Sequence, residues 1–234
     1  MHKINLGDNA VRNLNQLFID TAFNYQREWF KQGCRTRHLT KTRVCGADWL
    51  FSLEALLDAL HTGRDQIFLA DDVGTLDNAH HYFAGSLGLD GFEGTRESFI
   101  EDKATVYRIS NGAQISFLMV DALMAAYSGN VYVPEYAWAN NPALLMKMAS
   151  SLACHKHHRQ TYYTTPSRSF AAWQAYQKIT APKPDTWSGV ITIEDLLNSD
   201  CTLYTKERVD SIRSSMQPDH FEMAYMCQWQ PAVA

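Results

Sequence analysis

Residues 39–49 read LTKTRVCGADW and have the outline of a phosphate-binding loop. Such a loop follows a strand, turns sharply, and presents backbone N–H groups to phosphates at the partly positive N-terminus of a helix. A short strand is expected at 36–41, and an amphipathic helix that ends in a glycine stop is predicted at 46–63. Lys41 and Arg43 add two cations at the start of the loop. This stretch therefore predicts a strand–loop–helix unit that can hold phosphates.

The residues after the loop glycine depart from the usual pattern. A standard phosphate loop has two glycines and ends in Gly-Lys-Ser or Gly-Lys-Thr, whereas this loop continues with Ala47 and Asp48. An acid at a helix start is also favourable in an ordinary strand–turn–helix connection, so the residues alone leave that reading open. A carboxylate about 4 Å from a phosphate charge repels it by about 4 kcal/mol at an effective dielectric near 20. We therefore expect Asp48 to weaken nucleotide binding unless another group compensates.

The pattern along the rest of the chain predicts an α/β fold. An alternating segment at 105–120 pivots on Asn111-Gly112 and predicts a β-hairpin. The other predicted elements are helices at 10–30, 72–88 and 141–155, buried strands at 66–70, 130–135 and 160–165, and helices at 191–200, 206–216 and 218–228. Strands that alternate with helices indicate a mainly parallel sheet covered on both faces. A hinge is expected at 181–189, which divides the chain into 1–180 and a linker with a helical appendage, 181–234.

Composition excludes several classes of protein. The 234 residues carry a net charge of −4, so no overall basic field indicates nucleic-acid binding. The five cysteines are widely spaced without a C-x-x-C motif, which is typical of reduced thiols in a cytoplasmic protein. No apolar run reaches the roughly 18 residues that span a membrane. His155 and His158 are interpreted as part of a cationic helix end, not as a metal site.

Three further segments surround the loop in a fixed order: FNYQREWF (23–30), NVYVPEYAW (130–138) and TYYTTPSR (161–168). Together with the loop, they resemble the ATPase half of the large terminase subunits of tailed phages, the motors that pump DNA into procapsids. The resemblance is greatest to the branch whose loop reads K-[ST]-R-Q-x-G-A-T. It implies a P-loop NTPase fold of the RecA/ASCE type, with a mostly parallel sheet flanked by helices, a β-hairpin and a small C-terminal helical appendage.

The resemblance also implies roles for individual residues. Gln26 would bond the edge of adenine, Glu135 would orient the attacking water, and Arg43 would act on the phosphates as a second catalytic residue. Thr164 and Thr165 would couple hydrolysis to movement. The residues implied at the nucleotide are Tyr25, Gln26, Lys41, Thr42, Arg43, Gly46, Ala47 and Asp48. Without the resemblance, each of these segments also fits a plain helix face, helix start or strand end.

Two departures from the family pattern concern the magnesium ion. The family loop ends in a threonine whose hydroxyl binds the ion, and here that position is Asp48. The family strand ends in Asp-Glu, and here it ends in Pro134-Glu135, so a carboxylate near the ion is lost. Asp48 could bind magnesium directly and replace the lost acid. Otherwise ATP and magnesium binding is impaired, and we expect ATP hydrolysis to be weak or absent.

Two functions follow from these expectations. The first is a terminase-type ATPase domain that acts in phage DNA packaging in the bacterial host cytoplasm, as an oligomer or with terminase, portal or capsid partners and with weak DNA contacts. The second is a non-catalytic pseudoenzyme, a decoy or inhibitor that binds those packaging proteins and interferes with packaging. A decayed prophage remnant is the third reading. The nuclease domain of the family is expected to be absent.

Overall fold

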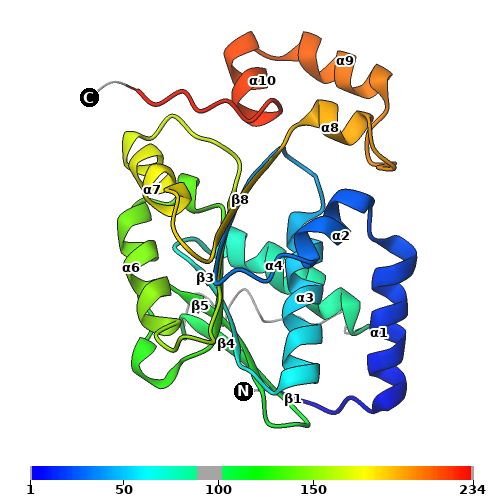
Figure 1. Ribbon diagram of the computed structural model, residues 1–234, viewed down its shortest axis with the longest axis vertical. Coiled ribbons are helices and arrows are strands. Elements are labelled where there is room, and N and C mark those ends of the chain that lie inside the picture. Colours follow the sequence, from blue (N-terminus) through cyan, green and yellow to red (C-terminus); the bar gives the residue numbers. More distant parts are fainter. Residues whose placement is uncertain (1, 89–101, 233–234) are drawn as a thin grey trace.

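The computed structural model describes residues 2–88 and 102–232, and Figure 1 shows helices on both faces of one sheet. Eight strands in the order β1-β4-β5-β3-β6-β7-β2-β8 form this sheet. All neighbouring strands pair parallel except β4 and β5, which form the antiparallel hairpin predicted from Asn111-Gly112. The strands are His2–Ile4 (β1), Thr36–Lys41 (β2), Gln66–Ala70 (β3), Ala104–Ile109 (β4), Gln114–Met119 (β5), Asn130–Pro134 (β6), Gln160–Thr164 (β7) and Thr186–Ile191 (β8). The predicted α/β class with a mostly parallel sheet is confirmed.

Helices cover the two faces of the sheet unequally. On one face lie Asp8–Thr21 (α1), Asn24–Phe30 (α2), Ala47–Thr62 (α3) and Val73–Ser86 (α4), and on the other lie Pro142–Leu152 (α6) and Phe170–Thr180 (α7). Each face has its own hydrophobic cluster. The central strands β3, β6 and β7 are buried along their whole length, as expected for parallel strands covered on both sides. The helix predicted at 46–63 is confirmed as α3, and Gly63 ends it with a left-handed φ of 72°.

The single helix predicted at 10–30 is wrong, because the structure has two helices there. Ala22 ends α1 and Phe23 precedes α2, and both have extended backbones. The side chain of Gln26 accepts a hydrogen bond from the backbone N–H of Phe23 at 3.0 Å, which caps the start of α2. The chain therefore bends between the two helices, and the bend brings Gln26 against the phosphate loop.

The residues after position 180 contribute to the sheet. Of the residues predicted as a hinge, 181–189, the first five precede β8 and the last four lie within it, and β8 pairs with β2 over six positions. Three helices follow, Ile193–Leu197 (α8), Lys206–Ser215 (α9) and Pro218–Ala224 (α10), and they lie beyond the end of β8 in Figure 1. The division of the chain at residue 180 stays a prediction, but β8 ties the second segment to the strand that carries the phosphate loop.

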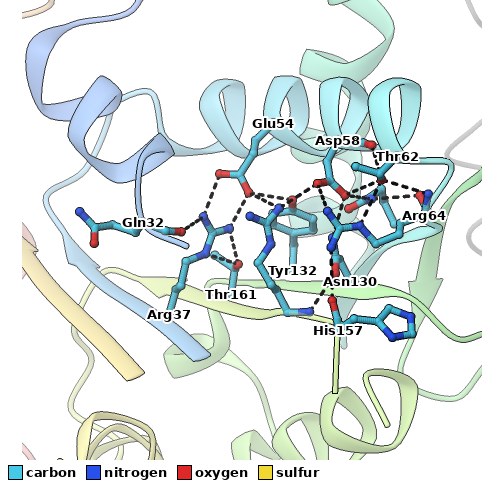
Figure 2. Close-up of polar contacts among 12 residues, drawn as sticks. Gln32, Arg37, Glu54, Asp58, Thr62, Arg64, Asn130, Tyr132, His157 and Thr161 are labelled. Carbon is cyan, nitrogen blue, oxygen red and sulfur yellow. Dashed lines mark hydrogen bonds and ion pairs between the residues drawn. The ribbon is translucent and has the colours of Figure 1, made fainter. Parts of the chain in front are cut away.

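A buried network of charges fixes α3 to the sheet, as Figure 2 shows. Arg37 on β2 forms two hydrogen bonds with the carboxylate of Glu54 on α3, at 2.5 Å and 3.0 Å. Both side chains are almost fully buried, at 2% and 3% exposure. The Tyr132 hydroxyl donates to the same carboxylate at 3.0 Å, and Arg37 also donates to Thr161 at 2.6 Å. One carboxylate on α3 thus connects strands β2, β6 and, through Arg37, β7.

A second acid one turn further along α3 extends this network. Asp58 accepts hydrogen bonds from Arg64 at 2.8 Å and from Asn130 at 2.9 Å. Arg159 lies 3.3 Å from Glu54 and 3.4 Å from Asp58, so it bridges the two acids. Since α3 begins at the phosphate loop, these contacts hold its N-terminus at a fixed place above the sheet.

Candidate nucleotide-binding site

Three neighbouring strands end at one edge of the sheet. Strand β7 pairs with β2 on one side and with β6 on the other, and all three are parallel. Their carboxyl ends therefore bring Lys41, Thr164 and Glu135 to the same edge. A cavity of about 810 Å³ opens there, within the range typical of small-molecule sites. Its wall includes Gln26, Lys41, Arg43, Val44, Cys45, Gly46, Ala47, Asp48, Asp71, Asp72, Glu135, Trp138 and Thr165.

The loop between β2 and α3 has the backbone shape of an anion-binding turn. Val44 and Gly46 both have left-handed backbones, with φ of 52° and 72°. A β-branched residue rarely adopts a positive φ, so the surrounding contacts must hold Val44 in place. In proteins generally, alternation of right-handed and left-handed residues turns successive N–H groups toward one side, and such concave sites bind phosphate. A Cβ atom at Gly46 would lie 2.5 Å from Nε2 of Gln26, so a larger residue there would force the Gln26 side chain to shift, in addition to the strain of its positive φ.

Contacts from both ends of the chain hold this loop. The Tyr25 hydroxyl donates to the carbonyl of Cys45 at 3.0 Å. The Tyr204 hydroxyl, between α8 and α9, donates to the carbonyl of Arg43 at 2.9 Å, and the N–H of Arg43 donates to the carbonyl of Ala224 in α10 at 3.2 Å. The Arg43 side chain is exposed at the cavity, where it is free to reach a phosphate. Loop shape therefore depends on α2 and α10 as well as on its own residues.

Lys41 and Glu135 form the charged centre of the site. The buried Lys41 ammonium contacts one carboxylate oxygen of Glu135 directly and lies 3.4 Å from the Thr165 hydroxyl. The other Glu135 oxygen accepts from the N–H of Thr165 at 2.9 Å and from the Thr164 hydroxyl at 3.3 Å. Burial acts to lower the pKa of Lys41, but the Glu135 carboxylate outweighs it and raises that pKa. Lys41 is therefore a permanent cation beside the loop.

Asp48 lies in the first turn of α3 and lines the same cavity. Burial raises the pKa of its carboxyl, and the Glu135 charge adds to this effect. Lys41 and the neighbouring Tyr163 hydroxyl act in the opposite direction without cancelling it. Ionisation of Asp48 is therefore unfavourable for the folded protein, and a cation near the carboxylate would reduce that free-energy penalty.

Replacing Asp48 with asparagine is expected to stabilise the folded chain at neutral pH. The pKa of Asp48 is raised on folding, so ionisation penalises the folded state as pH rises above the ordinary value of 3.8 through the folded value. The asparagine variant lacks this penalty. Urea unfolding at pH 7.5 should give it a higher midpoint than the parent chain, and the difference should shrink toward pH 4. An equal difference at both pH values would contradict the assigned pKa shift.

Three other residues predicted at the nucleotide, Thr42, Ala47 and Gln26, are buried. Thr42 is buried, and its hydroxyl makes no hydrogen bond within the described part of the chain. Ala47 is buried at the start of α3. Gln26 is only 1% exposed and donates to the carbonyls of Gly46 at 3.2 Å and Cys45 at 3.4 Å. Its predicted bond to adenine is not tested by these contacts, and neither are the roles predicted for the other residues.

Two acids at the cavity were not predicted from the sequence. Asp71 and Asp72 follow β3 directly and line the cavity. Their position after a buried strand was the sequence signal that could have placed them at the site. Asp71 accepts from the N–H of Asn140 at 2.6 Å, and Asp72 caps α4 by accepting from Thr75 at 2.8 Å. Among residues 2–88 and 102–232, no group of three potential metal ligands is close enough to hold an ion. Asp48, in the first turn of α3, is a carboxylate at this cavity of the kind that Mg²⁺ prefers as a ligand.

Comparison with known proteins identifies the family. The family model for the N-terminal part of the terminase large subunit, T4likevirus-type, matches residues 39–231. The chain belongs to this terminase family. Its ATPase subunit relatives include the terminase of Escherichia phage P2, 29% identical over 251 residues, and the probable terminase of Haemophilus phage HP1, 29% identical over 242 residues. These matches cover 95% and 92% of the chain but 41% and 38% of the relatives, so the chain spans about two fifths of their length.

Solved terminase structures share the fold. The large terminase ATPase domain of Thermus phage P74-26 matches with a TM-score of 0.67 at 12% identity, covering 92% of this chain and 96% of that domain. The large terminase of a thermophilic bacteriophage, solved in complex with ADP, matches with a TM-score of 0.66 at 11% identity, covering 89% of this chain and 54% of the other. The terminase resemblance and the P-loop fold that it implied are confirmed. Within the described residues, no helix is long and apolar enough to cross a membrane.

Proposed function

We propose that this terminase-family chain binds ATP in the cavity where β2, β7 and β6 end, and that it hydrolyses ATP weakly. The observation that carries the proposal is the contact of Lys41 with both Glu135 and Thr165 beside a loop of anion-binding shape. The large terminase of the thermophilic bacteriophage has been solved with ADP and with ATP-gamma-S. An ATP in this cavity would meet the loop N–H groups, the Lys41 ammonium and the Arg43 guanidinium.

Different side chains would bind the triphosphate and activate the attacking water. The loop amides, Lys41 and Arg43 would hold the triphosphate and stabilise the charge that develops on its oxygens. Glu135, fixed by Thr164 and Thr165, would accept a proton or hydrogen bond from the attacking water. When bound, a magnesium ion supplies further neutralisation of phosphoryl oxygens. Asp48 is the residue that would hold it.

Two residues explain why we expect slow turnover. Asp48 brings a negative charge to a position where the family has a neutral hydroxyl, and its raised pKa indicates that this charge is poorly compensated within the chain. Pro134, paired in register with Tyr163 at the end of β6, provides no carboxylate next to Glu135. The site therefore has the groups that bind a triphosphate, but it would hold the ion through Asp48, without the threonine hydroxyl and the second carboxylate of the family pattern.

The double variant Asp48→Thr, Pro134→Asp tests this function. It should raise magnesium-dependent ATP hydrolysis by about tenfold or more, since it restores both a hydroxyl ligand and a carboxylate near the ion. Each single variant should give less than the pair, and Asp210→Thr, an exposed acid on α9, should give no change. Phosphate release is the measurement. Fast turnover by the parent chain, on the order of 10 s⁻¹ as in typical enzymes, would contradict the proposal.

The absence of a threonine hydroxyl at position 48 and of a carboxylate at position 134 also favours a second function. In this alternative, the chain is a non-catalytic protein that binds packaging components. In that case neither ATP nor ATP-gamma-S would bind, and the double variant would not recover turnover. Purified terminase and portal proteins of a phage from the same host should then bind the chain, and its expression should lower the yield of packaged DNA. Absence of both nucleotide binding and these effects would contradict both functions.

A further inference from the structure

Residues 200–204, between α8 and α9, are attached to the N-terminal helices. The carboxylate of Asp200 accepts from the N–H of Asn24, with its two oxygens at 2.9 Å and 3.1 Å. Asn24 is the first residue of α2, so the carboxylate satisfies a backbone donor that the helix leaves without a partner of its own. One position later, Sγ of Cys201 lies 3.7 Å from the Tyr25 hydroxyl. This segment therefore lies against the junction of α1 and α2.

The other end of the segment is attached to the phosphate loop, because the Tyr204 hydroxyl donates to the carbonyl of Arg43 at 2.9 Å. Leu203 lies between these attachments and lines the cavity. Its side chain is 37% exposed, whereas Cys201 and Tyr204 on either side of it are buried. Covering such an apolar side chain with an apolar part of a ligand is favourable, because it removes the side chain from water.

The cavity wall beside Leu203 is mainly apolar. Leu17 and Thr21 of α1 and Phe23, just before α2, line the cavity, and the attachments of 200–204 bring Leu203 to their side. The carboxylates of the cavity wall come instead from the first turn of α3 and from the ends of β3 and β6. The base is the flat and least polar part of a nucleotide, and side chains hold it through its face. This part of the wall therefore suits a base, whereas the loop suits the phosphates.

We infer that Leu203 is a binding residue for the base of the nucleotide, and that a bound base holds residues 200–204 against α1. This inference rests on the proposed function, because it concerns the nucleotide in the same cavity. Leu203 contributes affinity through the face of the base, and groups at the edge of the base decide which base is preferred. Because Tyr204 connects the same segment to the loop, one continuous wall contacts the base and the phosphates.

Calorimetry of the whole chain with ATP-gamma-S and with tripolyphosphate, each with magnesium, tests the inference. Leu203→Ala should weaken ATP-gamma-S by about three- to tenfold, because it removes apolar area that the base covers. It should leave the affinity for tripolyphosphate, which has no base, within about twofold. Leu203→Met keeps the apolar area and should bind ATP-gamma-S within about twofold of the parent chain.

Leu144→Ala is the matched control for the alanine variant. Leu144 is a leucine of nearly the same exposure, 39%, and it lies on α6, on the other face of the sheet. The control should change the affinity for neither ligand.

Hydrogen exchange of the parent chain provides a second measurement, which does not depend on whether a variant folds. ATP-gamma-S should slow amide exchange in residues 200–204 more than tripolyphosphate does at equal saturation, since only the nucleotide has a base to cover Leu203. Exchange in the phosphate loop should be slowed by both ligands.

Three results would overturn the inference. The first is an unchanged affinity for ATP-gamma-S in a folded Leu203→Ala variant, and the second is equal protection of residues 200–204 by the two ligands. The third is an equal loss of affinity for both ligands, because Leu203 would then only support the loop. Failure of the proposed function looks different, since neither ligand would bind the parent chain, and the inference would fall with it.

Discussion

Replacing Glu54 with alanine is expected to lower the free energy of unfolding by about 3–5 kcal/mol, since it leaves a buried cation without its partner. The Arg37 guanidinium, 2% exposed, would keep only the Thr161 hydroxyl and the Gln32 carbonyl as acceptors. The Tyr132 hydroxyl would lose its acceptor as well. Urea unfolding followed by circular dichroism measures the loss. The effect is large because several strands depend on this one carboxylate.

A surface ion pair provides the matched control. Glu28 and Lys31 also form a contact at 2.7 Å, but their side chains are 64% and 67% exposed. Glu28→Ala should therefore change the free energy of unfolding by less than about 1 kcal/mol. A loss at Glu54 no larger than the loss at Glu28 would show that the buried network contributes little to stability.

The same network predicts a dependence on pH. Burial acts to raise the pKa of Glu54, but the Arg37 guanidinium outweighs it and lowers that pKa below 4.5. A lowered carboxyl pKa stabilises the fold above its ordinary value, and that contribution is lost as pH falls through the folded value. The difference between the parent chain and Glu54→Gln should therefore shrink as the pH falls below 4.5.

Replacing Lys41 with methionine is expected to weaken ATP binding by about 10- to 100-fold. The methionine keeps the length of the side chain but removes the buried ammonium next to the phosphate loop. Glu135 would keep its bonds from Thr164 and Thr165, and its charge would then repel the triphosphate without compensation. Calorimetric titration with ATP-gamma-S, which is hydrolysed slowly, measures the change.

Lys31→Met is the matched control for this variant, because Lys31 is an exposed lysine directly after α2. Its affinity should equal that of the parent chain. Unfolding in urea must show that Lys41→Met is folded before its affinity is compared. An unchanged affinity in a folded Lys41→Met variant would mean that the phosphates do not lie between the loop and Glu135.

Local signals predicted several elements of the fold, including the helix that follows the phosphate loop. The helix α3, with its glycine stop, and the hairpin at Asn111-Gly112 depend on residues close in sequence, so their patterns were readable. The order of the terminase-like segments also indicated strand β6, which leads to Glu135. Each of these features is determined by residues that are close together in the sequence.

Other features depend on contacts between distant residues and had no local signal. The break between α1 and α2 interrupts a run with helical spacing, and Gln26 both caps the second helix and supports a loop 20 positions later. The pairing of Arg37 with Glu54 joins a strand to a helix across the core. Periodicity indicates which face of an element is buried, but it does not reveal which polar groups meet there.

Strand β7 separates β2, which carries Lys41, from β6, which leads to Glu135. A ligand that pushes these two charged side chains apart must act on the strand between them, where Thr164 and Thr165 hold the carboxylate. We therefore expect a change in the distance between the lysine and the glutamate to move the segment from Thr165 to Arg168, which leads into α7. On that expectation, the middle strand would link bound phosphates to the opposite helical layer, and this link would not depend on how quickly the phosphate bond is broken.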